Sequence, residues 1–191
     1  MNIGIFGGSF NPIHIGHAII ASHILQNSAL EQIWFMVAPQ NPLKTWHDPA
    51  IDIHRIRMTE LVTRHIPGAS TSAFEFNLPQ PSFTISTLQQ LSLKFPQHKF
   101  ALIIGADNWQ LFHKWKDYET ILANYEIFIY PRLGYEILIP EHLTTVHQTD
   151  APIIQISSTQ IRQDINHGKD VRFLVSDDVY NYIKKHNLYT K

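Results

Sequence analysis

The chain contains no cysteine. Without thiols it cannot form a disulfide framework, use a cysteine nucleophile or build a zinc site that contains cysteine. Long hydrophobic runs are also missing, since none approaches the ~18 residues that would cross a bilayer. The start Met1-Asn2-Ile3-Gly4 has no basic stretch followed by an apolar segment. We therefore expect a cytoplasmic protein without a membrane partner.

An excess of charge of either sign is likewise absent. Lys and Arg total 15 against 16 Asp and Glu, so the net charge is −1. No global basic field would attract nucleic acid, and a phosphate would have to be bound by local contacts. The length of 191 residues and the 44% hydrophobic content predict one domain over residues 1–191. A homo-oligomer is compatible with this composition and is not indicated by it.

Short apolar runs that are separated by helical patterns predict repeated βαβ units. The runs lack polar alternation, which is typical of strands buried on both faces of a parallel sheet. They cover residues 2–6, 33–37, 100–104, 127–130 and 153–156, with a weaker one at 71–76. Helical spacing covers residues 18–25, 51–62 and 85–95. We expect an α/β fold, a three-layer Rossmann-like domain with a mostly parallel sheet.

Two helices are expected to close the chain. Ser157-Ser158-Thr159 offers N-cap residues for a helix that runs through Ile165 and ends near Gly168. Ser176 would cap a second helix that ends at His186. Before them, the proline-containing stretch 39–49 reads as a long loop after the second strand, where such sheets bind ligands.

Glycine is scarce and unevenly distributed. Half of the eight glycines lie in the first sixteen residues: Gly4, Gly7, Gly8 and Gly16. Glycines after a first strand let a ligand approach the backbone, and the start of the next helix attracts phosphate. The spacing matches neither the dinucleotide fingerprint G-x-G-x-x-G nor the phosphate loop G-x-x-x-x-G-K-[ST].

Two histidines follow the glycines in His14-Ile15-Gly16-His17. Their spacing places two imidazoles one turn apart on one face of a helix start. Gly16 between them would leave room for a phosphate, and two ring N–H donors can stabilise charge on a phosphoryl group during transfer. Two ordinary histidines are the alternative interpretation. A zinc site would need a third ligand that the sequence does not provide, so we assign no metal ligands.

This run resembles the signature of the H-x-G-H nucleotidyltransferase superfamily, which includes the class I aminoacyl-tRNA synthetases. Further blocks between residues 3 and 189 are similar to bacterial nicotinate-nucleotide adenylyltransferases: Pro81-Ser82-Phe83-Thr84, Gly105-Ala106-Asp107, Lys114-Trp115, Ile156–Arg162 and Val179–Tyr189. The resemblance implies transfer of the adenylyl group of ATP to nicotinate mononucleotide, giving deamido-NAD and pyrophosphate in NAD biosynthesis. Mg²⁺ would arrive bound to ATP, without a dedicated protein cage.

The resemblance also implies a role for each matching residue. The catalytic residues would be His14, His17, Lys44 and Arg162. Residues 157–191 would complete the ATP site, whose contacts would be Gly7, Gly8, Ser9, Phe10, Gly16, Gly105, Asp107, Ser157, Ser158 and Thr159. The mononucleotide would contact Thr84, Trp115 and Arg132.

Some of these roles also follow from residue type. Hydroxyls at a helix start, together with Arg162 one turn later, suit a polyphosphate. Asp107 after a strand could accept ribose hydroxyls or cap a helix. Trp115 could stack on a pyridine ring or pack in the core. Lys44 lies on the long loop, and an exposed loop lysine is its alternative interpretation.

Four positions depart from the pattern of similar enzymes. Leu43 stands where a histidine is usual, Ile13 where a proline is usual, Phe83 where a tyrosine is usual and Ser86 where an aspartate is usual. No proposed catalytic group is removed by these departures. They leave nicotinamide mononucleotide open as the acceptor, with phosphopantetheine as a further alternative. A nucleotide-binding module without catalysis is the alternative from another functional class.

Overall fold

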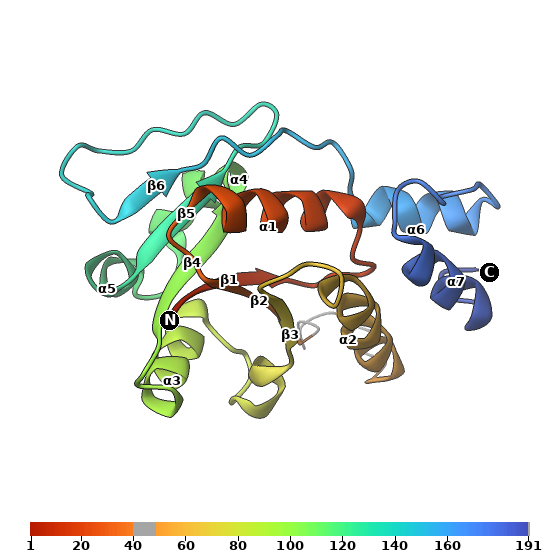
Figure 1. Cartoon of the computed structure of the whole chain (residues 1–191), viewed down its shortest axis with the longest axis horizontal. Helices are drawn as coiled ribbons and strands as arrows, with labels where there is room; N and C mark the ends of the chain where they lie inside the picture. The colour runs from red at the N-terminus through yellow and green to blue at the C-terminus, as the bar shows by residue number, and fades with distance from the viewer. Residues whose placement is uncertain (40–48, 191) are drawn as a thin grey trace.

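The computed structural model describes residues 1–39 and 49–190, with side chains from residue 51 in the second range. Its centre is a sheet in which every pairing is parallel, in the order β3-β2-β1-β4-β5-β6 (Figure 1). The strands are β1 (Asn2–Gly8), β2 (Gln32–Val37), β3 (Ala69–Ser72), β4 (Lys99–Gly105), β5 (Glu126–Tyr130) and β6 (Val146–Gln148). The order reverses between β1 and β4, where a crevice for ligands opens beyond the carboxyl ends of the strands.

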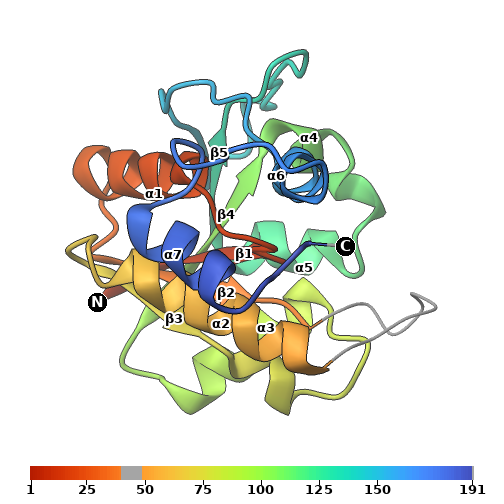
Figure 2. The same ribbon diagram turned by 90° about the vertical axis from the view of Figure 1, so that its right-hand side faces the viewer.

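Helices cover both faces of the sheet. One face packs on α1 (Ile15–Asn27), α2 (Pro49–Thr63), α6 (Ser158–Asn166) and α7 (Asp177–Lys185). The other face packs on α3 (Thr84–Lys94), α4 (Ala106–Gln110) and α5 (Tyr118–Asn124), with short 3-10 helices η1 (Phe74–Asn77) and η2 (Phe112–Lys114). The C-terminal helices lie beyond the end of β1, and α7 lies against α2 (Figure 2).

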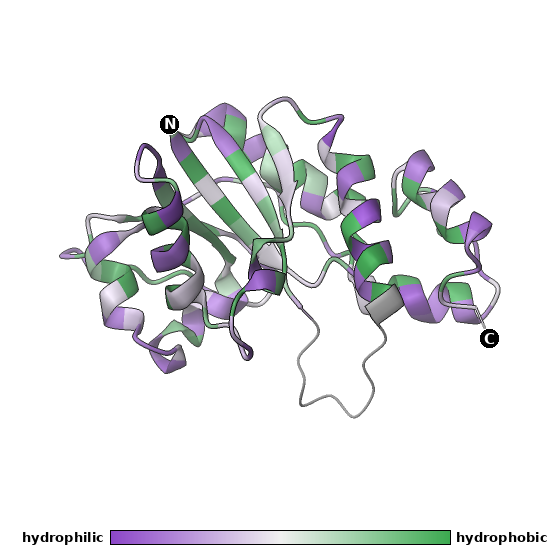
Figure 3. Cartoon of the chain, turned by 90° about the horizontal axis from the view of Figure 1, so that it is seen from below, coloured by the Kyte–Doolittle hydropathy of each residue, from purple (hydrophilic) through white to green (hydrophobic). Residues whose placement is uncertain are grey.

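The strand sequences explain this layering. Phe6 of β1 packs into the core under α1, whereas Ile3 and Ile5 pack into the core over α3. Successive side chains of a strand point to opposite faces, so a run without polar alternation supplies both cores at once. Figure 3 shows the strands largely in the colour of hydrophobic residues and the helices with polar stripes. The prediction of a three-layer α/β fold with a parallel sheet is confirmed.

Two strand predictions need correction. Residues 153–156 form no strand: Ile154 lies against Gly16 of α1, and Ile153 is exposed. The strand at that edge is instead β6, whose polar His147 and Gln148 gave no apolar signal. Residues 71–76 divide between the end of β3 and the 3-10 helix η1. The helices that cap at Ser157 and Ser176 are confirmed.

Within residues 1–39 and 49–190, no helix combines the length and the apolar character needed to cross a membrane.

Candidate functional site

The turn after β1 is shaped by the ring of Phe10. Phe10 has a positive φ of 44° and is 2% exposed, and its ring contacts that of His17 with 5.0 Å between centroids. A Cβ on Gly8 would lie 2.9 Å from this ring, so residue 8 has to be glycine. Beside Gly7, by contrast, the space is open. The ring of Phe10 is therefore not available to ATP, and any contact from Phe10 would come from its backbone.

The two histidines stack on each other at the start of α1. His14 is the N-cap residue, and its ring lies 3.7 Å from the ring of His17 between centroids. The backbone N–H of His14 donates to Nδ1 of His17 over 3.2 Å. A neutral His17 therefore carries its proton on Nε2, which leaves that atom as the donor. A Cβ on Gly16 would lie 3.0 Å from the His14 ring and from Ile154, so Gly16 makes room for these side chains.

Both imidazoles are neutral at pH 7. Burial, together with the positive charge of Arg132, lowers the pKa of His14 to about 4. The pKa of His17 is also well below its usual range, because of burial first and then the charges of His14 and Arg132. Removing water from around an imidazole disfavours its charged form. The pair can therefore donate hydrogen bonds to an anion from neutral rings.

These low pKa values make the fold sensitive to acid. The unfolded chain binds protons on His14 and His17 near pH 6.5, whereas the folded chain binds one on His14 only near pH 4. Stability should therefore be fully present above pH 6.5 and fall as pH decreases towards 4, by at most about 1.4 kcal/mol per pH unit for each histidine. Urea denaturation at pH 7, 6 and 5 measures this slope. His14→Gln should have a shallower slope than the wild type, and equal slopes would contradict the assignment.

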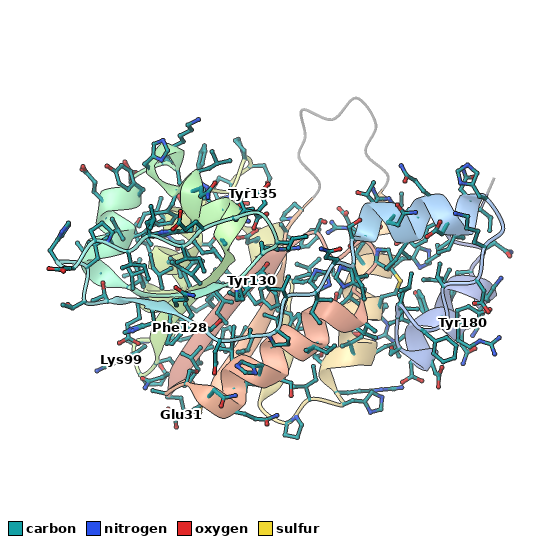
Figure 4. The ribbon with its side chains drawn as sticks, turned by 90° about the horizontal axis from the view of Figure 1, so that it is seen from above. Glu31, Lys99, Phe128, Tyr130, Tyr135 and Tyr180 are labelled. Atoms are coloured by element: carbon teal, nitrogen blue, oxygen red, sulfur yellow. The ribbon has the colours of Figure 1, made fainter. Side chains whose placement is uncertain are left out.

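Arg132 links the ends of β4 and β5. Its Nε lies 3.6 Å from Oδ1 of Asp107, and its Nη2 donates to the hydroxyl of Tyr130 over 3.1 Å. Tyr130 is labelled in Figure 4. Asp107 Oδ1, Arg132 Nε and His14 Nδ1 are among the few buried side-chain atoms of the described residues without a hydrogen-bond partner. Asp107 Oδ1 and Arg132 Nε face each other as an ion pair, which offsets part of the cost of burying them, whereas His14 Nδ1 has no hydrogen-bond partner that would do so.

Asp107 does not cap α4, since the N-cap residue is Gly105. A Cβ on Gly105 would collide with the carboxylate of Asp107 and would lie 3.1 Å from the ring of Tyr130. The glycine therefore allows the carboxylate to fold back over the end of β4. The sequence-based alternative of a helix cap for Asp107 is wrong, whereas its position at the strand edge is confirmed.

A cavity of about 580 Å³ opens beside these residues, between the α3 and α4 segments. Its strand side consists of the ends of β1, β4 and β5, including Gly7, Gly105 and Tyr130. Thr84 and Trp115 line the opposite side, and Trp115 also packs on Phe112 with 5.2 Å between centroids. Trp115 therefore packs against its neighbours and also lines the cavity, and its stacking on a pyridine ring stays a prediction.

The C-terminal segment binds directly to the turn before His14. Arg162 Nη1 donates to the backbone oxygen of Asn11 over 2.7 Å, and Ser158 Oγ donates to that of Pro12 over 2.8 Å. The hydroxyl of Tyr189 donates to Oδ1 of Asn11 over 2.6 Å. Ser158, Arg162 and Tyr189 thus make three hydrogen bonds to the turn at Asn11 and Pro12.

The three hydroxyls at the start of α6 have different partners. Ser157 caps the helix by accepting from the backbone N–H of Gln160, and Thr159 accepts from Arg162 Nη2 over 3.3 Å. The hydroxyl of Ser158 donates to the backbone oxygen of Pro12. The contact of Ser158 with ATP stays a prediction. The free N–H groups of the helix start remain available to an anion.

The contact of Tyr189 with Asn11 should be measurable as stability. Tyr189→Phe removes the hydroxyl and leaves Oδ1 of Asn11 without this donor, so the free energy of unfolding should fall by about 1–2 kcal/mol. Urea denaturation measures the change. The matched control is Tyr118→Phe, because the Tyr118 hydroxyl reaches an exposed neighbour, Glu119, at 3.4 Å. Equal losses in both variants would contradict a specific role for the contact.

Sequence reasoning missed two residues of this region and assigned one that lies outside the described residues. Arg55 of α2 is buried and donates from Nη1 to the backbone oxygens of Ser9 and Ala38, over 2.5 and 2.8 Å. It therefore ties together the turns after β1 and β2. Nothing in a helical pattern distinguishes it from a surface arginine.

Tyr189 lies in a block that matches similar enzymes, but the sequence alone assigns it no role. Lys44 falls outside the described residues.

No group of three or more histidine and acidic side chains that could hold a metal ion lies within the described part of the chain. Asp107 is a single carboxylate that already faces a guanidinium. Mg²⁺ often keeps its waters and binds through substrate phosphates. The side chains at this site therefore fit a metal ion that enters with a nucleotide.

Comparison with known proteins finds a matching family model and full-length relatives that share one name. The family model described as "Cytidylyltransferase-like" matches residues 5–164. A protein of Flavobacterium psychrophilum named "Probable nicotinate-nucleotide adenylyltransferase" is 44% identical over 193 residues, covering 100% of both chains. A protein of Bacteroides fragilis with the same name is 43% identical and covers 94% of this chain and 90% of its own.

A solved structure supports the fold. The nicotinic acid mononucleotide adenylyltransferase of Plasmodium falciparum, complexed with APC, superposes with a TM-score of 0.79 at 20% identity. The match covers 98% of this chain and 96% of the other.

Proposed function

The chain belongs to the nicotinate-nucleotide adenylyltransferases of the cytidylyltransferase-like family, and we propose that it joins ATP to nicotinate mononucleotide at the cavity beyond the ends of β1, β4 and β5, with the help of His14 and His17. The products are deamido-NAD and pyrophosphate. The observation that carries the proposal is the cavity of about 580 Å³ at the ends of β1, β4 and β5, in a chain that also holds the ion pair of Arg132 with Asp107 and a buried His14 Nδ1 without a hydrogen-bond partner. We further propose one domain over residues 1–191, working in the cytoplasm.

The proposed ATP site lies at the ends of β1 and β4. Gly7 and Gly8 let the nucleotide approach the backbone, and Asp107 accepts hydrogen bonds from a ribose. The helix start at Ser157–Thr159, together with Arg162, receives the β- and γ-phosphates, and Mg²⁺ enters as part of the substrate MgATP. Lys44 is proposed as a further phosphate ligand from its position in the sequence.

The mononucleotide is proposed to bind in the cavity, with its pyridine ring on Trp115. The first backbone N–H groups of α3, at Thr84, would receive its carboxylate, because a helix start attracts anions. Arg132 would bind its phosphate. A phosphate oxygen then attacks the α-phosphorus of ATP in line, the bond to the bridging oxygen breaks, and pyrophosphate leaves with the electron pair. No covalent intermediate with the protein is needed.

His14 and His17 act by hydrogen bonding in this proposal. Charge increases on the oxygens of the transferred phosphoryl group, and donors that are already oriented stabilise it without reorganising. Because Nδ1 of His17 is occupied by the backbone of His14, its Nε2–H is the donor. Because the pKa of each ring is low, both imidazoles are neutral at pH 7, and a neutral imidazole still has one N–H group to donate.

Pyrophosphate release tests the proposed reaction. The protein is offered MgATP with nicotinate mononucleotide, nicotinamide mononucleotide or phosphopantetheine as separate acceptors. We expect release with nicotinate mononucleotide at a kcat/KM at least ten times that of the other two. Equal rates with nicotinamide mononucleotide would contradict the assignment of nicotinate mononucleotide as the preferred acceptor. If no acceptor gave pyrophosphate, a nucleotide-binding module without catalysis would be favoured.

His17→Ala should lower kcat by about 10²–10³-fold, because it removes one oriented donor. Steady-state kinetics with saturating substrates measures the loss, and a melting curve checks that the fold remains. His23→Ala is the matched control: His23 lies on the same helix but pairs with Asp150 at 2.6 Å, away from the site. Near-normal turnover of His17→Ala would exclude the proposed role.

A further inference from the structure

Glu75 is an acidic side chain in the cavity to which neither the motifs nor the proposed reaction gives a role. It belongs to η1 and lines the cavity together with Thr84 and Trp115. A carboxylate here is unexpected, because the proposed acceptor brings a carboxylate of its own. Like charges at short range disfavour each other, so this glutamate requires a physical explanation.

The hydrogen bonds of Glu75 show what its side chain is attached to. The hydroxyl of Thr87, on the first turn of α3, donates to Oε1 of Glu75 over 2.8 Å. Burial raises the pKa of Glu75, while hydrogen bonds from the side chains of Thr87 and Ser82 oppose this rise. The carboxylate is thus attached by a hydrogen bond to the first turn of α3.

The backbone of Glu75 takes part in the same network. Its carbonyl oxygen accepts from Nε2 of Gln80 over 3.0 Å, and Oε1 of Gln80 accepts from the backbone N–H of Ser82 over 3.3 Å. Residue 75 is therefore connected to the turn 80–84 through its side chain and through its main chain. That turn forms one wall of the cavity and leads into the free N–H groups at Thr84.

We propose that Glu75 is the positioning residue for the acceptor pocket: it holds turn 80–84 and the start of α3 in place, so that the N–H groups there meet the carboxylate of the pyridine ring. The inference rests on the proposed function, because it takes the start of α3 as the carboxylate subsite. The hydrogen bond from Thr87 directs the Glu75 carboxylate towards α3 and stabilises it there, which explains how this wall carries an acidic side chain. Among the described residues that line the cavity, Glu75 is the acidic one.

Two variants of Glu75 separate position from charge. Glu75→Gln keeps an oxygen that accepts from Thr87 and removes the charge, whereas Glu75→Ala removes both. We expect Glu75→Ala to raise KM for nicotinate mononucleotide by about 10-fold, with KM for ATP changed less than about 2-fold. Glu75→Gln should stay within about 3-fold of the wild type for both substrates. Glu119→Ala, an exposed glutamate of α5, is the control and should change neither.

Thr87→Val removes the donor from the other side of the same bond. It should reproduce the selective rise in KM, and the double variant with Glu75→Ala should be no worse than Glu75→Ala alone, because both remove one interaction. Additive effects would overturn the proposal. So would an equal rise in KM for ATP, an equal effect of Gln and Ala, or no effect of Ala in a variant that melts normally.

The choice of acceptor supplies the last readout. In Glu75→Ala, the ratio of kcat/KM for nicotinate mononucleotide to that for nicotinamide mononucleotide should fall about 5-fold. The reason is that displaced N–H groups at the start of α3 weaken the binding of the charged carboxylate more than the binding of the neutral amide. An unchanged ratio would contradict the positioning role. If the wild type does not use nicotinate mononucleotide, the proposed function fails. That outcome is distinct from an active wild type whose Glu75 variants behave normally, which refutes the inference alone.

Discussion

The hydrogen bonds that residues 158–189 make with the turn at Asn11 and Pro12 are the constraint on which the site depends. They hold a segment that leaves β1 with a positive φ at Phe10 and delivers His14 to the start of α1. Arg55 of α2 also holds this turn, through the backbone oxygen of Ser9. With the turn held in this way, the two histidine rings can stack and one nitrogen of His17 is left to face a substrate.

Charge at this site is arranged locally, in agreement with a chain whose net charge is −1. Arg132 places a guanidinium near both imidazoles, and its influence adds to burial in keeping them neutral. An anion in the crevice would meet a fixed positive charge and neutral donors, an arrangement that gains strength where water is excluded. The balance at Glu75 is the reverse, because the hydrogen bond to its carboxylate opposes the effect of burial on its pKa.

Much of the fold could be predicted from the sequence because its signals are local. Buried strands read as apolar runs, and Ser157 and Ser176 read as helix caps. The prediction failed at 153–156, where an apolar run packs on α1, and at β6, where an edge strand has polar residues. The glycine and histidine motifs were found because their spacing is fixed. Arg55, Glu75 and Tyr189 were not, since their roles come from contacts between residues far apart in the chain or in different elements.

The attachment of Asn11 to Tyr189 spans 178 positions of the chain. During synthesis, the glycine turn and both histidines are made first, yet the groups that hold them are made last. A nascent chain that lacks residues 158–189 keeps the contact of Arg55 with Ser9 but lacks the three hydrogen bonds to Asn11 and Pro12. The turn before His14 therefore gains its full set of contacts only after the last residues of the chain have been made.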